Sequence, residues 1–278
     1  MAKSGLMKKP GLTNHVKKDH RLEPDKPDAR DHVYEIPEPH HGKALPSSVD
    51  LRHHCPPVYN QESTDSCTAH AVSGAYACHR RQTKARHFKP SPRFIYYNER
   101  ELTNQLQGDC VVHLRDALKA VAKRGVCPAH LWRFSNSERL TGRKPPQRAF
   151  AAARNHRIVS YLRIGGTKHK PADLLTRLKH CLADGHTFVF AFAIYPNFRH
   201  GWEKWKHGIM PMPGPRTAKK IEHHAVLAVG YDDELQAFLV RNSWGPKFGT
   251  GGYFRMPYSV ITNPSYAYDF WTVRGVTG

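Results

Sequence analysis

The sequence contains no apolar stretch long enough to cross a membrane. Its longest run, Phe188–Tyr195, has the length of a β-strand, whereas a spanning helix needs about 18 or more apolar residues. The segment Met1–Leu22 carries six Lys or Arg and no apolar core of the kind that secretory signal peptides contain. We therefore expect no membrane span and synthesis in the cytoplasm, and export by another route stays open.

Acidic residues are scarce relative to basic ones. The chain has 23 Asp and Glu against 43 Lys and Arg, which gives a formal net charge of +20. Arg80–Arg93 holds six basic residues and no acid, and Arg133–Lys170 holds ten against one Glu. No zinc-finger spacing, recognition-helix pattern or aromatic RNA-binding motif accompanies this charge. We interpret the basic runs as solvated faces with some weak anion binding, and we do not expect nucleic acid as the main partner.

Paired cysteine motifs are also missing. Six cysteines are spread along the chain without any C-x-x-C pair: Cys55, Cys67, Cys78, Cys110, Cys127 and Cys181. In a chain of this length without a secretory signal, an even number does not establish disulfides, so we predict that most are reduced, buried side chains. His53-His54-Cys55 has no spaced partners that would complete a metal site, and we expect neither metal nor cofactor.

What the sequence does contain divides into a leader and a body. Residues 1–44 are rich in Lys, His, Pro and Asp, and we interpret them as an extended leader or pro-segment rather than a core element. Residues 45–275 form the folded body, which we expect to be a monomer. Helical patterns dominate from about residue 50 to 170 and strand patterns from about 171 to 275. This order predicts an α+β fold with a helical lobe, a β lobe and a cleft between them.

Individual elements follow from periodicity and from residues that end helices. Helices are predicted at Cys67–Arg81, at Leu114–Arg124 before Gly125, and at Pro171–Asp184 before Gly185. Strands are predicted at 187–194, 225–231, 237–241, 252–256 and 270–273. The second and third of these strands flank a short acidic turn, which indicates a hairpin.

The start of the first helix is a place where a cysteine could become reactive. Thr64, Asp65 and Ser66 can all cap a helix, and Cys67 follows them directly. A helix N-terminus and a nearby imidazolium both lower the pKa of a thiol, and only the thiolate is a good nucleophile. Cys127, the other cysteine near a helix start, lacks a comparable context. The sequence therefore predicts that Cys67 is a nucleophile.

A histidine and an asparagine meet in the predicted hairpin. His224 precedes one strand and Asn242 follows the next, so the hairpin places the two side chains next to each other. An amide oxygen there could accept the imidazole N–H and select its tautomer. Trp244 would shield that hydrogen bond from water.

These residues resemble papain and the cathepsins. The resemblance rests on Gln61-x5-Cys67, on the sequence from His224 to Tyr231, on Asn242-Ser243-Trp244-Gly245 and on Gly251-Gly252-Tyr253, and it covers about residues 45–275. The sequences around residues 24–31 and 49–52 are similar to the bacterial and microbial branch. His224 and Asn242 follow Cys67 at somewhat more than the usual ~130–150 residues, which indicates insertions between them.

The resemblance implies a papain-like two-lobe fold, with a helical lobe, a β-barrel-like lobe and a cleft between them. It also implies a cysteine-type peptidase that acts on a peptide or protein substrate. Cys67 would attack the scissile carbonyl. His224 would form a thiolate–imidazolium pair with Cys67 and act as general base and acid, and Asn242 would orient His224. Gln61 would donate a hydrogen bond to the oxyanion, with the backbone N–H of Cys67 as the second donor. No metal or cofactor is implied.

The match is weakest around the nucleophile. Thr64, Asp65 and Thr68 stand where the family usually has a disulfide cysteine, a glycine and a tryptophan. Aligned on the following helix, Asp109 takes the place of the other cysteine of that disulfide, so both halves of the bridge are replaced together. This double loss suits a reducing compartment.

The same alignment suggests which residues meet the substrate. Val111 and Val112 occupy positions where the family has glycines that line the substrate backbone. The residues expected at the substrate are Asp65, Ser66, Val111, Val112 and Trp244.

Three functional interpretations remain open in the sequence. The first is an active peptidase, with endopeptidase or exopeptidase action undecided. The second is a catalytically altered relative that binds peptides without cutting them, for which the changes at Asp65 and Thr68 are the only support. The third is a basic protein that binds anions or nucleic acid. We also expect the leader to regulate access to the cleft.

Overall fold

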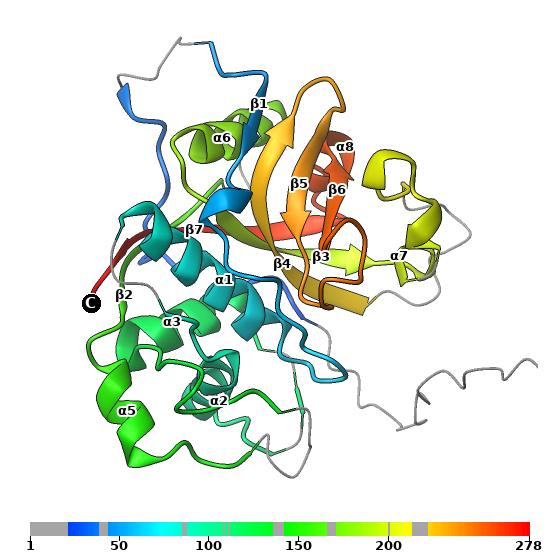
Figure 1. Cartoon of the computed structure of the whole chain (residues 1–278). Helices are drawn as coiled ribbons and strands as arrows, with labels where there is room; N and C mark the ends of the chain where they lie inside the picture. The colour runs from blue at the N-terminus through cyan, green and yellow to red at the C-terminus, as the bar shows by residue number, and fades with distance from the viewer. Residues whose placement is uncertain are drawn as a thin grey trace, which may run out of the picture.

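The computed structural model describes residues 22–38, 44–84, 88–107, 109–110, 112–135, 142–165, 171–199, 201–212 and 222–278. Helices and a large sheet lie side by side, with α1 between the sheet and the other helices of the first half (Figure 1). The helices are α1 (Cys67–Gln82), α2 (Pro92–Leu102), α3 (Leu114–Arg124), α5 (Gln147–Ala153), α6 (Pro171–Ala183), α7 (Pro196–Arg199) and α8 (Tyr258–Ile261), with short 3-10 turns η2 (Arg52–His54), η3 (Trp202–Lys204) and η4 (Lys206–Gly208).

Within the described residues, seven strands form one antiparallel sheet. They are β1 (Ser48–Asp50), β2 (Ile158–Arg163), β3 (Phe188–Ile194), β4 (Glu222–Asp232), β5 (Ala237–Arg241), β6 (Tyr253–Pro257) and β7 (Ala267–Val276). Their order is β2-β7-β3-β4-β5-β6, with β1 on β4. The predicted α+β arrangement is confirmed. However, β2 and β6 are two ends of this path, so the described sheet is open rather than closed into a barrel (Figure 1).

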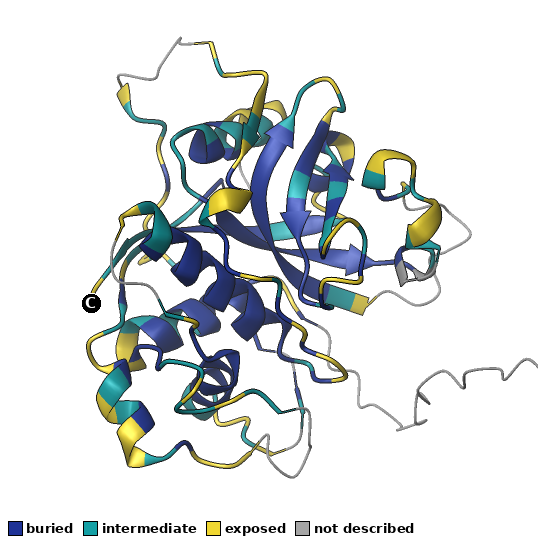
Figure 2. Cartoon of the chain, viewed as in Figure 1, coloured by how far each residue is buried: buried dark blue, intermediate teal, exposed yellow. Residues whose placement is uncertain are grey.

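The sheet separates two hydrophobic cores, and β3 is therefore buried on both faces. Phe188, Phe190 and Phe192 point to one core, which α6 and α8 cover. Val189 and Ala191 point to the other core, together with the side chains of α1 and α3. This alternation follows from the period of two along a strand. Figure 2 shows that α1 and the central strands are buried almost throughout.

Small side chains allow α1 to approach the sheet closely. All residues of α1 from Cys67 to Arg80 are buried. A Cβ atom added at Gly74 would lie 3.2 Å from Cδ2 of Leu227 on β4, so a larger residue there would push the helix away. The close packing matters for function because the first residue of α1 is Cys67 and the neighbouring strand begins near His224.

The helix α2 and the strand β2 are among the elements that were not expected from the sequence. The helix α2 begins after Ser91, whose side chain accepts a hydrogen bond from the backbone N–H of Phe94, and Pro92 is its first residue. This is a usual helix start, although it lies within a strongly basic run. The edge strand β2 pairs with β7 through an irregular register. Because β2 lies before residue 170, the sheet includes part of the segment that was assigned to the helical lobe.

The described part of the leader packs into the body rather than projecting from it. Its backbone is extended, as expected, but Leu22 and Tyr34 are 2% and 1% exposed and belong to the two cores. The backbone N–H of Tyr34 donates to the carbonyl of Arg163 on β2 at 2.8 Å. The expectation that residues 1–44 contain no core element is therefore wrong for these residues, because their apolar side chains fill gaps between the sheet and the helices.

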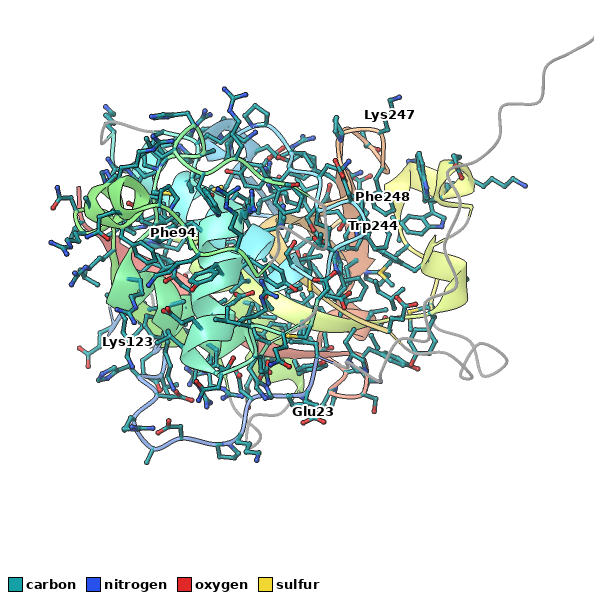
Figure 3. The ribbon with its side chains drawn as sticks, turned by 90° about the horizontal axis from the view of Figure 1, so that it is seen from below. Glu23, Phe94, Lys123, Trp244, Lys247 and Phe248 are labelled. Carbon is teal, nitrogen blue, oxygen red and sulfur yellow. The ribbon has the colours of Figure 1, made fainter. Side chains whose placement is uncertain are left out.

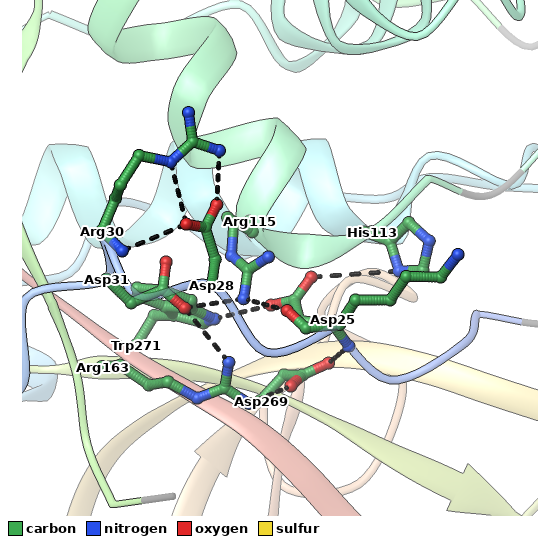
Figure 4. Close-up of polar contacts among 10 residues, drawn as sticks. Asp25, Asp28, Arg30, Asp31, His113, Arg115, Arg163, Asp269 and Trp271 are labelled. Carbon is green, nitrogen blue, oxygen red and sulfur yellow. Dashed lines mark hydrogen bonds and ion pairs between the residues drawn. The ribbon is translucent and has the colours of Figure 1, made fainter.

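Buried ion pairs also hold the leader in place (Figure 4). The carboxylate of Asp269 accepts from the backbone N–H of Asp25 at 2.6 Å and from Arg163 at 2.9 Å. Asp31 accepts from Arg115 at 2.6 Å and from Arg163 at 3.3 Å. Burial, with the Asp25 carboxylate nearby, raises the pKa of Asp269 to about 6. These contacts join the leader to α3, β2 and β7.

Candidate active site

Cys67 is the first residue of α1 and lies against β4. Its side chain is 2% exposed and shares a core with Ala225, the residue after His224. Burial raises the pKa of the Cys67 thiol to about 12, while the backbone N–H groups of Ala225 and Thr68 favour the thiolate. Burial thus disfavours the thiolate, and a nucleophilic reaction requires a group that accepts the proton of the thiol.

The predicted proximity of His224 and Asn242 is confirmed by the structure. The Nε2 atom of His224 lies 2.8 Å from Oδ1 of Asn242. The same Oδ1 accepts the backbone N–H of Ser243 at 2.8 Å, which identifies this atom as the amide oxygen. Nε2 must therefore carry a hydrogen, and in the neutral imidazole Nδ1 has the lone pair. Asn242 in this way determines which nitrogen of His224 can accept a proton.

Aromatic rings surround this histidine. The ring of Trp244 lies 5.1 Å from that of His224, and Phe192 on β3 lies 6.0 Å away. Phe248 packs against Trp244 at 5.1 Å, and Figure 3 shows these two labelled rings next to each other. His224 and Asn242 are 4% and 2% exposed. The rings keep water from the His224–Asn242 hydrogen bond, as expected of Trp244.

Gln61 is held in a fixed orientation in the loop before α1. Its Oε1 accepts from the hydroxyl of Ser243 at 2.6 Å, and its Nε2 donates to the carbonyl of Thr64 at 2.8 Å. The backbone N–H of Gln61 also donates to the carbonyl of Ser243 at 2.8 Å. An amide nitrogen has two hydrogens, so one N–H of Gln61 remains for another acceptor.

The loop between Gln61 and Cys67 is stabilised differently from the prediction. Ser66 is the residue before α1, but its side chain makes no capping hydrogen bond. It is fully buried, 2.6 Å from Oγ1 of Thr64 and 3.1 Å from Nδ1 of His70. The expected contact of the Ser66 side chain with substrate is therefore wrong, because this side chain points into the protein.

Asp109, which lies between α2 and α3, connects that segment to the loop before α1. Both its carboxylate oxygens lie 3.1 Å from the backbone N–H of Asp65, and the hydroxyl of Tyr96 on α2 also donates to it. The segments that carry a disulfide in the family are thus in contact here through hydrogen bonds. The sequence did not reveal this role of Asp109, because a carboxylate in a loop has many uses.

The other residues expected at the substrate differ in position. Asp65 is half-buried at the start of α1, and Trp244 is half-buried beside His224. Val112 is 4% exposed, so its side chain is not a wall that substrate can reach. Val111 lies outside the described residues.

Two buried ionisable side chains contact the residues on either side of Cys67. Glu99 contacts Thr68, and His70 contacts Ser66. The hydroxyl of Thr68 donates to Oε1 of Glu99 on α2 at 3.0 Å, and burial raises the pKa of Glu99 to about 8. The Nδ1 atom of His70 lies 2.8 Å from the carbonyl of Ser66, and burial lowers the pKa of His70 to about 4. His70 therefore has the structural role that the sequence indicated. Glu99 was not foreseen, because its partner Thr68 is distant in sequence.

A basic hollow lies next to the Gln61 loop. Its volume is about 460 Å³, and its lining includes Asn60, Lys89, His130 and Arg133, with no carboxylate among the lining residues that the structure describes. Within the described ranges, no group of three or more His, Cys, Asp or Glu side chains is arranged to hold a metal ion. No helix among the described residues is long and apolar enough to span a bilayer.

Comparisons with known proteins find a matching family model and a viral relative. A family model described as papain family cysteine protease matches residues 45–266. An uncharacterized peptidase C1-like protein of Acanthamoeba polyphaga mimivirus is 38% identical over 224 residues, which cover 78% of this chain and 70% of the viral protein.

Solved structures show the same fold. Xylellain, a cysteine protease from Xylella fastidiosa, is 34% identical with a TM-score of 0.80, covering 94% of this chain and 99% of xylellain. Bromelain from Ananas comosus, in complex with the E64 inhibitor, has a TM-score of 0.60 over 82% of this chain and 98% of bromelain. At 19% identity the bromelain structure shows a likeness of fold alone.

Proposed function

The chain belongs to the papain family of cysteine proteases, and from this premise we propose that Cys67, His224 and Asn242 carry out its hydrolysis of peptide bonds. The observation that carries the assignment is the pair of hydrogen bonds to Oδ1 of Asn242. They leave Nδ1 of His224 as the nitrogen that accepts a proton from a nucleophile. Cys67, at the start of α1 and beside Ala225, is the nucleophile that this arrangement serves.

These positions support the following reaction. The Cys67 thiol transfers its proton to Nδ1 of His224, and the sulfur attacks the scissile carbonyl carbon. The resulting imidazolium keeps its Nε2–H bond to Asn242 and returns the proton from Nδ1 to the leaving amine. Water then attacks the acyl-enzyme with His224 as base, which releases the carboxylic acid and restores the thiol.

Gln61 is proposed to stabilise the oxyanion. Its Oε1 accepts from Ser243, and one of its two Nε2–H groups binds Thr64. The second N–H and the backbone N–H of Cys67 are the two donors for the oxyanion. Because the Gln61 amide is held in advance, it does not need to reorganise during the reaction.

A thiol-directed epoxide tests the assignment. Intact protein at neutral pH should be labelled once, on Cys67, with loss of peptidase activity. Cys67→Ala should abolish labelling and turnover, and His224→Ala should slow both strongly. Cys181→Ser, on the distant helix α6, is the matched control and should keep both. Labelling that is equal among several cysteines, or turnover that survives Cys67→Ala, would show that another group is the nucleophile. A labelled protein that cuts no peptide would instead indicate the binding-only alternative.

We further propose that the protein binds anions weakly. The basic hollow with Lys89 and Arg133 supports weak binding of anions, including acidic parts of substrates. Binding to DNA across a salt titration tests this, because contacts with phosphates weaken steeply as salt rises.

The monomeric state is proposed for the body, and analytical ultracentrifugation tests it. Cytoplasmic synthesis is proposed from the composition of the first 22 residues, and cell fractionation tests it.

A further inference from the structure

Two cysteines outside the proposed catalytic group lie unusually close together. Cys55 follows η2, and Cys78 lies on α1, three turns after Cys67. Their Sγ atoms are 2.8 Å apart. A covalent S–S bond is about 2.05 Å long, so these sulfurs are less than ~1 Å from bonding distance. Both side chains are buried, with Cys55 8% and Cys78 2% exposed.

The two thiols are not equivalent. The pKa of Cys55 is lowered, chiefly because Cys78 donates a hydrogen bond to it and also because Arg241 is near. Burial raises the pKa of Cys78. The guanidinium of Arg241 is held beside the chain that leaves Cys55, since it donates to the carbonyls of Pro56 at 2.6 Å and Pro57 at 2.7 Å. Cys55 is thus the more exposed thiol with a fixed cation near it, and Cys78 lies behind it.

We propose that Cys55 and Cys78 form a reversible intramolecular disulfide by exchange with a small disulfide. The Cys55 thiolate attacks one sulfur of the small disulfide, which forms a mixed disulfide and releases one small thiolate. The Cys78 thiol then loses its proton and attacks Sγ of Cys55, and the second small thiolate leaves. Two protein thiols are oxidised, one small disulfide is reduced, and two protons pass to the two small thiolates. A reducing thiol pool reverses the reaction.

The bridge would enclose the segment that carries the proposed catalytic loop. Residues 56–77 lie between the two cysteines and contain Gln61 and Cys67. A bridge restricts the unfolded chain, so the oxidised protein should resist unfolding better than the reduced one. For a loop of this length in a protein of this size, we expect a rise in Tm on the order of 5–10 °C. The reduced and oxidised forms therefore differ in stability within the same fold.

Mapping of the disulfide decides the proposal. The full chain with Cys67→Ala, which removes the proposed nucleophile, is equilibrated in an oxidised and reduced glutathione mixture and then blocked with N-ethylmaleimide. We expect two thiols to be lost and one linked peptide pair, Cys55 with Cys78, which dithiothreitol separates. Five blocked thiols, a different pair, or stable glutathione adducts on these cysteines would overturn the proposal.

A second measurement does not depend on peptide mapping. The Tm of the Cys67→Ala protein should rise on oxidation and fall again with dithiothreitol. This redox-dependent shift should disappear in a further Cys55→Ser variant and persist in a Cys181→Ser variant. An equal shift with Cys55→Ser would overturn the proposal, and if that variant folds poorly the mapping still decides. Peptidase activity enters neither measurement, so failure here leaves the proposed function intact.

Discussion

Asn242 is the residue that gives His224 a defined tautomer. Its amide oxygen receives both the Nε2–H of His224 and the backbone N–H of Ser243, so the amide cannot turn without breaking two hydrogen bonds. If Nδ1 of His224 carried the hydrogen instead of Nε2, Nδ1 could not accept a proton from the nucleophile. The effect of Asn242 on turnover should therefore come from orientation and not from substrate binding.

Replacing Asn242 should lower the rate of the chemical step. We expect Asn242→Ala to reduce kcat on the order of 10²-fold with little change in KM, because misplacement of a reacting group by about 1 Å has such an effect. Steady-state kinetics with a peptide substrate measures this. Asn197→Ala on α7 is a control that should keep wild-type values. A change confined to KM would show that Asn242 acts on substrate binding instead.

At the scale of elements, α2 supports the start of α1 through a buried carboxyl group. Glu99 accepts from Thr68, its other oxygen Oε2 has no hydrogen-bond partner within the described residues, and its pKa is raised to about 8. A raised carboxyl pKa stabilises the fold when the group is protonated. This contribution is complete below about pH 4.5 and is lost as the pH rises through about 8.

Glu99→Gln should therefore remove part of the pH dependence of stability. We expect the variant to gain stability relative to the wild type as the pH rises from 5 to 9, by up to a few kcal/mol, on the order of 1.4 kcal/mol per pKa unit. Urea unfolding at several pH values measures it. Glu101→Gln on the same helix is the matched control. Parallel profiles for wild type and Glu99→Gln would mean that Glu99 is not protonated in the fold.

A second link at this scale joins Asp109 to the loop before α1. Its carboxylate binds the Asp65 backbone N–H and the Tyr96 hydroxyl, in the place of a covalent bridge. Removal takes an acceptor from the backbone N–H of Asp65, which costs about 1–3 kcal/mol for a buried group, whereas the Tyr96 hydroxyl can still donate to the carbonyl of Cys110. The loop that carries Gln61 would also lose one of its attachments.

Asp109→Ala should lower both stability and kcat. Asp109→Asn keeps one acceptor oxygen, so its stability and kcat should lie between those of Asp109→Ala and the wild type. Thermal unfolding and peptide turnover provide the measurements, and Asp173→Ala, an exposed position on α6, serves as the control. If Asp109→Ala unfolds and turns over like the wild type, the hydrogen bonds of Asp109 do not stabilise the loop.

At the scale of the whole molecule, the leader from about residue 22 onward is part of the folded body. Leu22, Asp25 and Tyr34 are buried in the body, and the carbonyl of Leu22 accepts from Tyr268, whose hydroxyl lies 2.6 Å from Nδ1 of His223. The leader thus reaches the histidine next to His224. Deletion of residues 1–44 would remove these contacts and would confuse loss of folding with a change in access to the cleft.

Two truncations separate folding from regulation. Deleting residues 1–44 should lower Tm strongly, because buried apolar and ion-paired groups are lost. Deleting residues 1–21 removes none of the described contacts, and Tm should stay close to that of the full chain. If the leader regulates access, the second truncation raises peptide turnover. Unchanged turnover in a folded, soluble protein would end the regulatory hypothesis for residues 1–21.

Some of this molecule could be determined from the sequence because the determinants are local. The strands that precede and follow the acidic turn are short apolar runs, so the hairpin and the meeting of His224 and Asn242 were predictable. The helix that begins at Cys67 was predictable from its small, closely spaced residues. The family followed from the motifs around these same positions, and the reaction class followed from the family.

Only the tertiary structure decided contacts between distant segments. The apposition of Cys55 with Cys78, the bond from Asp109 to Asp65 and the burial of Leu22 each depend on how α1, α2 and the sheet pack together. Ser66 looked like a helix cap and instead turns inward, because buried partners were available to it. Periodicity reports which face of an element is apolar, but it does not report which distant side chain meets that face.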